Sequence, residues 1–231
     1  MIFDPDKMMA LDVDTINAFM KEGGLLYKPE VETIKQNLSM ITHAVANYGI
    51  KILSFVDKHY GDEEHALAET ELKINGGQFD LHAVVGTEGA DKIPETILEK
   101  DVVFIPTDLD ISNDSLKTML SNVKQIVIEK QAICAFYDEN NIGGNSVLYS
   151  VLDILDPQDV FVYGVYTEYC VKENAMPFLV MGQNVWIIRD AVVPYNIDSG
   201  DGDRALVDMA NMGARFITTD DFIRLLKNNF D

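Results

Sequence analysis

The sequence is poor in positive charge and in cysteine. Its 18 Lys and Arg residues stand against 38 Asp and Glu, which gives a formal net charge of −20 at pH 7. A chain this acidic is repelled by nucleic-acid phosphates and by anionic membrane surfaces, so neither is an expected partner. The two cysteines, Cys134 and Cys170, are too few for a disulfide framework and lack metal-knuckle spacing, so each needs its own explanation.

Long apolar runs and a secretory signal are also missing. No run approaches the roughly 18 residues that cross a bilayer. The first residues, MIFDPDKMMALDVD, lack the basic region, apolar core and small-residue cleavage site of a signal peptide. Because no linker rich in Pro, Gly or Ser interrupts the chain, we expect one soluble, cytoplasmic domain over residues 1–231.

Short β-branched runs alternate along the chain with amphipathic stretches. Helical spacing of apolar residues predicts helices, the longest from Glu30 to Asn47. The alternation predicts an α/β fold of three layers (α/β/α), with a mostly parallel sheet of about six strands. Ligands bind such sheets at the carboxyl ends of the strands, so the residues that follow each strand are the site candidates. The strand candidates are MALDVD, IKILSFV, VVFI, QIVIEK, VFVYGV, NVWIIRD and RFITT.

Three strand ends carry chemically useful side chains. Asp14 ends the first strand, Lys130 ends QIVIEK, and Cys170 lies at the start of a helix that follows VFVYGV. A helix N-terminus would lower the pKa of this thiol and offer N–H groups to an oxyanion. The three residues would supply a base, a cation and a nucleophile. The ordinary alternatives are a capping carboxylate, a lysine that reaches solvent and a buried apolar cysteine.

These motifs resemble those of the isochorismatase-like cysteine hydrolases, and within that family most closely those of nicotinamidases. The pattern ID-x-Q-x-D-F is represented by Asp14 and Phe19 in VDTINAF, and the motif G-V-x-T-D-x-C-V by GVYTEYCV around Cys170. Lys130, in EKQAICAF, stands where the family has a lysine. The resemblance implies that Asp14, Lys130 and Cys170 are the catalytic residues.

The resemblance also assigns backbone roles near the nucleophile. It implies an oxyanion hole made by the N–H groups of Tyr166 and Cys170, and a cis peptide bond between Val165 and Tyr166. Asp12 departs from the pattern, because the family has an apolar residue at that position. The sequence therefore leaves open whether Asp12 contributes to the site.

The stretch from Phe55 to Val84 holds three of the four histidines. Nicotinamidases carry D-x-H after the second strand and a further histidine before G-T-x-G-A; here DKH gives Asp57 and His59, and FDLHAVVGTEGA gives His82. The resemblance implies that these three residues bind a divalent metal, zinc first, with iron or manganese as alternatives. Residues 57–90 would then form a metal and substrate loop. The alternative is a solvated loop in which histidines pair with the acids of GDEEHALAETE.

The implied activity is hydrolysis of nicotinamide to nicotinate and ammonia, in pyridine-nucleotide salvage and NAD metabolism. The reaction would pass through a Cys thioester, with the metal holding the pyridine ring and Phe19 and Phe79 lining the pocket; core packing is the alternative for both rings. Other candidates are a family member that cleaves a carbamoyl or ureido amide, and a catalytically silent binding protein. The sequence leaves open a homo-oligomer, a role for His65, and whether the acids at 62–64 add ligands or form a lid.

Overall fold

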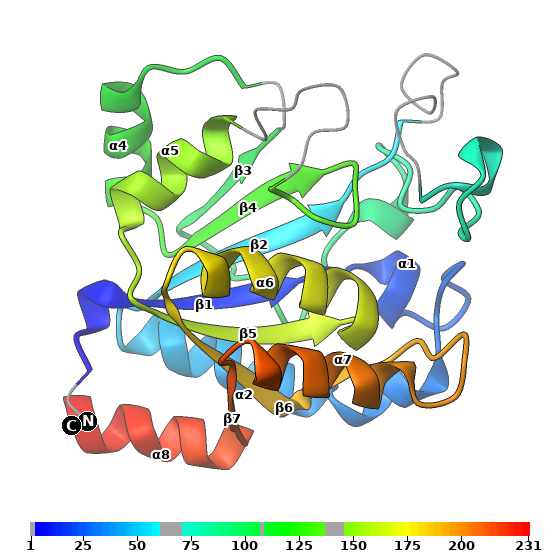
Figure 1. The fold of residues 1–231 in the computed structure, drawn as a ribbon. Coiled ribbons are helices and arrows are strands. Elements are labelled where there is room, and N and C mark those ends of the chain that lie inside the picture. The colour runs from blue at the N-terminus through cyan, green and yellow to red at the C-terminus, as the bar shows by residue number, and fades with distance from the viewer. Residues whose placement is uncertain (1–2, 61–70, 107–108, 137–145) are drawn as a thin grey trace.

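Seven parallel strands form a single sheet within the described residues, in the order β3-β4-β2-β1-β5-β6-β7 (Figure 1). The computed structural model describes residues 3–60, 71–106, 109–136 and 146–231. The predicted parallel α/β sheet is confirmed, with seven strands where about six were expected. The strands are β1 (Met8–Val13), β2 (Lys51–Asp57), β3 (Val102–Ile105), β4 (Gln125–Lys130), β5 (Asp159–Val165), β6 (Asn184–Val193) and β7 (Arg215–Ile217).

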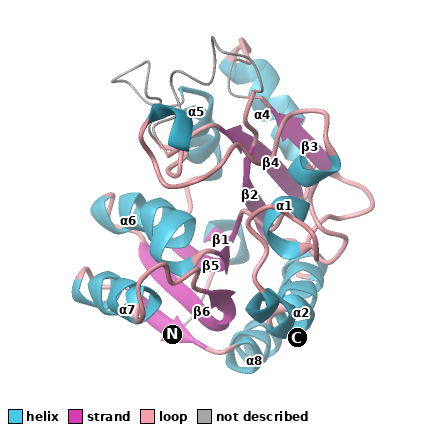
Figure 2. Ribbon diagram, turned by 90° about the vertical axis from the view of Figure 1, so that its right-hand side faces the viewer, coloured by secondary structure: helices cyan, strands magenta, loops and turns pink. Residues whose placement is uncertain are grey.

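Helices cover both faces of the sheet, as Figure 2 shows. Helices α2 and α8 pack on one face, while α4, α5, α6 and α7 pack on the other. Side chains of β1 alternate between the two cores: Met8 and Ala10 enter the first, Met9 and Leu11 the second. The central strands β1, β2, β4 and β5 are mostly apolar because both of their faces are buried. The helices are α1 (Asn17–Met20), α2 (Lys35–Asn47), α4 (Asn113–Ser121), α5 (Ser146–Leu155), α6 (Lys172–Val180), α7 (Asp201–Asn211) and α8 (Thr219–Phe230).

The strand order places a topological switch beside β1. This strand pairs with β2 on one side and with β5 on the other, so the connections from these strands diverge at their carboxyl ends. The three strands and β4 end in the segments that carry the candidate residues. Among the described residues, no helix is long and apolar enough to cross a membrane.

Gly164 allows β5 to approach β1 closely at this edge. Its φ is +122°, and a Cβ atom built on it would lie 2.0 Å from the carbonyl oxygen of Val13, its register partner. No other residue type fits this contact without a backbone shift. Gly164 therefore lets β5, which leads into the turn of Cys170, pack directly against Val13, the residue before Asp14.

We predict that Gly164→Ala lowers the free energy of unfolding by about 3 kcal/mol or more, because overpacking adds to backbone strain. Gly182→Ala is the matched control: its φ is +90°, but no atom lies within 4 Å of the added Cβ. Strain alone should reduce the stability of that variant by about 1–2 kcal/mol. Urea unfolding measures both values, and equal losses would contradict the close-contact explanation.

Candidate active site

Asp14, Lys130 and Cys170 lie together at the carboxyl edge of the sheet. The Nζ atom of Lys130 is 2.8 Å from Oδ2 of Asp14 and 3.7 Å from Sγ of Cys170. The three residues are 0%, 2% and 6% exposed, respectively. Lys130 therefore does not extend to solvent, and the predicted base, cation and nucleophile are in contact.

Asp14 is fixed by the neighbouring strand. Its N–H donates to the carbonyl of Phe55 at 2.9 Å, and its Oδ1 accepts from the N–H of Asp57 at 2.9 Å. Its φ of +52° is left-handed, a conformation that aspartate adopts more readily than most non-glycine residues. This turn directs the carboxylate away from the line of β1 and toward Lys130.

The Lys130 ammonium lies between two carboxylates. It contacts Asp57 as well as Asp14. Burial acts to lower the pKa of Lys130, but Asp14, Asp57 and Cys170 together raise it well above its usual value. The side chain therefore remains a cation inside the protein.

Burial also shifts the pKa values of the proposed base and nucleophile. Burial and the Asp57 carboxylate raise the pKa of Asp14 to about 6, although Lys130 lowers it. Burial and then Asp14 raise the pKa of the Cys170 thiol well above its usual value, against the effect of Lys130. The predicted lowering of this thiol pKa is wrong, because burial beside a carboxylate outweighs the helix terminus. Cys170 lies in a π-helical turn, η5 (Thr167–Val171), and not in a regular first α-turn.

The residues of the predicted oxyanion hole flank this turn. Tyr166 immediately precedes η5, and Cys170 lies within it. The expected cis peptide bond between Val165 and Tyr166 is confirmed. The role of the two N–H groups in holding an oxyanion stays a prediction.

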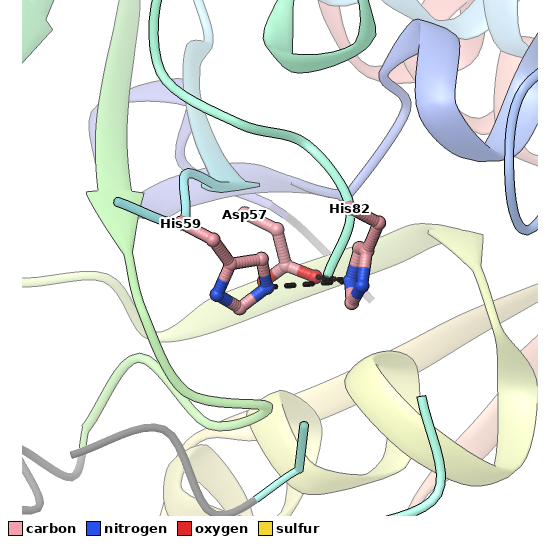
Figure 3. A group of neighbouring side chains, drawn as sticks. All are labelled: Asp57, His59 and His82. Carbon is pink, nitrogen blue, oxygen red and sulfur yellow. Dashed lines mark hydrogen bonds and ion pairs between the residues drawn. The ribbon is translucent and has the colours of Figure 1, made fainter. Parts of the chain in front are cut away.

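Asp57, His59 and His82 converge from the end of β2 and from the loop that follows it (Figure 3). The Nε2 atom of His82 is 3.3 Å from Nε2 of His59 and 3.5 Å from Oδ2 of Asp57. All three residues are buried, and one donor atom from each lies within 4.8 Å of the others. The structure thus brings the predicted metal ligands to one point.

The surroundings of these residues suit a divalent metal. The Nδ1 N–H of His82 donates to the carbonyl oxygen of Asp80 at 2.7 Å, while Nε2 of the same ring faces Asp57. Metal-bound histidines commonly have this outer hydrogen bond. Burial acts to raise the pKa of Asp57, but Lys130 and the two histidines hold it well below its usual range. The donor set therefore fits zinc, iron or manganese.

The two predicted pocket rings both lie near His82. The Phe19 ring centroid is 5.3 Å from that of His82 and 5.8 Å from that of Tyr166. The Phe79 ring is 6.2 Å from His82 and 5.1 Å from the ring of Tyr169. Phe19 is buried and Phe79 is half-buried, and both rings lie beside the predicted metal ligand His82.

Asp12 is engaged elsewhere, which answers the question that the sequence left open. Its Oδ2 is 2.6 Å from Nζ of Lys92, and it accepts hydrogen bonds from Thr15 at 2.7 Å and Ser54 at 3.0 Å. Because these contacts satisfy its charge, Asp12 forms a separate buried ion pair two residues before Asp14.

Sequence reasoning missed Glu71, a buried carboxylate whose Oε1 lies 3.8 Å from Nε2 of His59. It ends the acidic run GDEEHALAETE, where nothing in the pattern distinguishes it from its neighbours. His65 and the acids at 62–64 lie outside the described residues. Cys134 is buried, and its thiol donates to the carbonyl oxygen of Glu173 at 3.2 Å.

Residues 118–221 match the family model of the Isochorismatase domain. The isochorismatase-like resemblance is confirmed. Solved structures of the same fold include the pyrazinamidase of Pyrococcus horikoshii in complex with zinc, at 24% identity and a TM-score of 0.66, covering 92% of this chain and 99% of that chain. The Acinetobacter baumanii nicotinamidase pyrazinamidase gives 18% identity and a TM-score of 0.70, with 95% and 100% covered.

The N-carbamoylsarcosine amidase of Thermoplasma acidophilum is similar at 21% identity and a TM-score of 0.65, covering 93% of this chain and 97% of that chain. Among curated proteins, none matches the chain. At these identities the solved structures establish a shared isochorismatase-like fold.

We predict that Lys130→Met destabilises the metal-free protein by about 3–5 kcal/mol, because it leaves Asp14 and Asp57 buried without their cation. Lys73→Met is the matched control. Lys73 pairs with Asp80 at 2.7 Å, but both side chains are more than half exposed, so the loss should stay below about 1 kcal/mol. Urea unfolding in the presence of a chelator measures both, and equal losses would contradict the structural role of Lys130.

Proposed function

We propose that this isochorismatase-like chain is an amidohydrolase that converts nicotinamide to nicotinate and ammonia. The observation that carries the proposal is the position of Asp57, which contacts Lys130 through one oxygen and lies 3.5 Å from His82 through the other. Asp57 thus joins the residues around Cys170 to the proposed metal ligands. A pyridine amide offers one atom to each set: its electrophilic carboxamide carbon to the thiol, and its ring nitrogen to the metal.

Asp14 would accept the proton of Cys170 when the substrate binds. Its pKa of about 6 suits a group that accepts and returns protons near neutral pH. Lys130, 3.7 Å from the sulfur, would stabilise the thiolate that attacks the carboxamide carbon. The N–H groups of Tyr166 and Cys170 would receive the oxyanion.

Collapse of the tetrahedral adduct would expel ammonia, with the proton returned from Asp14, and leave a thioester on Cys170. Asp14 would then take a proton from water, which attacks the thioester and releases nicotinate. Phe19 and Phe79 would hold the pyridine ring between them. Each ring contact of this kind contributes on the order of 1 kcal/mol.

Asp57, His59 and His82 would hold a divalent ion, for which we propose zinc, with iron and manganese as the alternatives. When bound there, the ion would supply a Lewis acid to the pyridine nitrogen. The zinc complex of the P. horikoshii pyrazinamidase, which has this fold, supports this choice. We propose pyridine-nucleotide salvage in the cytoplasm as the setting.

A second candidate is hydrolysis of a carbamoyl or ureido amide. The similarity to N-carbamoylsarcosine amidase favours it. In that case the metal-ligating residues would have no part in substrate recognition. A catalytically silent binding protein is less compatible with the contacts of Lys130 with Asp14 and Cys170.

We predict that Cys170→Ala lowers ammonia release from nicotinamide by at least about 1,000-fold, because the covalent route requires this thiol. Acid-quenched wild-type protein should carry a nicotinoyl adduct, visible by mass spectrometry. Cys134→Ser should still form the adduct, since Lys130 contacts Asp14 and the thiol of Cys170, whereas the Cys134 thiol donates to the carbonyl oxygen of Glu173. Amidase activity that survives in Cys170→Ala would show that the covalent mechanism is wrong.

We predict that His59→Ala and His82→Ala each remove stoichiometric zinc and reduce kcat/KM for nicotinamide by more than about 100-fold. Loss of a direct ligand should exceed the 10- to 100-fold effect of an outer-shell change. His43→Ala is the control, because His43 is exposed on α2. Metal content and ammonia release are measured on all three variants and after chelation. Turnover of carbamoyl substrates with none of nicotinamide would favour the second candidate.

A further inference from the structure

A cavity of about 490 Å³ adjoins the candidate active site. Its lining comes from the segment that precedes His82, from the loop that follows Lys130, and from the segment around Cys170. Phe79, one of its walls, lies 6.2 Å from the ring of His82, and Tyr169 immediately precedes the nucleophile. A substituent on a substrate bound to these residues would extend into this cavity.

The lining of the cavity is acidic and aromatic. Glu71, Glu168 and Glu173 line it, and no Lys or Arg is among its described lining residues. The rings of Phe79 and Tyr169 meet edge to face, with centroids 5.1 Å apart. Carboxylates together with aromatic rings form an environment that attracts cations.

The three carboxylates of this cavity have different surroundings. Glu71 lies 3.8 Å from Nε2 of His59, so the charge of the cavity depends on the other two. Glu168 accepts hydrogen bonds from the backbone N–H groups of Tyr195 and Asn196, which carry no net charge. Glu173 is exposed, and its side chain is available to a ligand at the rim of the cavity. The cavity therefore keeps a negative charge.

A neighbouring cavity of about 400 Å³, which reaches toward α7, is also lined mainly by acidic side chains among its charged residues. It shares Glu168 and Tyr169 with the first cavity. Its two cations are paired with acids of α7: Lys172 with Asp208 at 2.7 Å, and Arg204 with Asp201. The approach to the site is thus acidic, in a chain whose net charge is −20.

We propose that the 490 Å³ cavity binds a positively charged substituent of the substrate, so that the preferred substrate is an amide that carries an ammonium group. The inference rests on the proposed function, since it extends the amide that the active site hydrolyses. A neutral pyridine amide leaves the acidic wall unused, and an anionic substituent is repelled by it.

The test compares pyridine-3-carboxamides that carry aminomethyl, hydroxymethyl or carboxyl groups at carbon 5 or carbon 6. With the zinc-loaded protein at low salt, the aminomethyl compound should exceed the hydroxymethyl compound in kcat/KM by about tenfold at one of the two positions. The carboxyl compound should be the poorest. The advantage should shrink at least about threefold in 0.5 M NaCl, because salt screens charge. No advantage at either position would overturn the proposal.

Variants of Glu173 test whether the preference for the aminomethyl compound arises in this cavity. Glu173→Gln should lower the ratio of kcat/KM values for the aminomethyl and hydroxymethyl compounds by about threefold, and Glu173→Lys should lower it further. Glu99→Gln and Glu99→Lys make the same changes at an exposed position that does not line the cavity, and should leave the ratio unchanged. Equal ratios in the wild type and the Glu173 variants would overturn the assignment to this cavity.

Binding to zinc-loaded Cys170→Ala separates this inference from the proposed function. If the wild type hydrolyses neither nicotinamide nor its derivatives, the proposed function is wrong, and calorimetry still compares the aminomethyl and hydroxymethyl compounds. A dissociation constant about tenfold lower for the aminomethyl compound supports the cation site. Equal constants, or no binding of the aminomethyl compound, contradict it.

Discussion

The candidate active site is organised around one buried cation, the Lys130 ammonium. Removal of an ammonium and two carboxylates from water is unfavourable by several kcal/mol for each ion, and only close mutual contact offsets this. Lys130 and Asp57 face each other in the parallel register of β4 and β2, while Asp14 follows the next strand, β1. The ion cluster is therefore a product of the sheet itself. It forms only when the carboxyl ends of three adjacent strands are aligned.

The same cluster sets the chemistry available to Cys170. The thiol lies beside an anion, Asp14, and a cation, Lys130, in a buried position where each has a large effect. The Asp14 carboxylate raises the pKa of the thiol and so favours its protonated form at rest, and it also lies close enough to accept the proton. Lys130 opposes this effect and becomes the favourable partner once the thiolate forms. A neutral resting thiol paired with a base of raised pKa is thus compatible with proton transfer on substrate binding.

The sequence predicted what depends on strand ends and could not predict what depends on burial or distant partners. Asp14, Asp57 and Lys130 each end a recognisable strand, and such ends converge in any parallel sheet. The prediction of a lowered thiol pKa was wrong because this pKa depends on how Cys170 is packed, and the spacing of residues in the sequence does not reveal packing. The Asp12 partner was missed because Lys92 is 80 positions away and outside any strand. Strand β7, of only three residues, lies within the predicted run RFITT, whose β-branched and aromatic residues were sufficient to indicate it.

The pair of Asp12 and Lys92 explains how an acid can occupy a buried strand so near Asp14. Asp12, Thr15 and Lys92 satisfy one another within 2.6–2.8 Å. The segment that carries Lys92 is also joined by its backbone to the residues after Asp14, through the Ile93 N–H and the Thr15 carbonyl at 3.0 Å. That segment follows the loop of His82. The chain therefore returns from the loop of His82 directly onto the turn after Asp14, so the same contacts link the position of Asp14 to that of the predicted metal ligands.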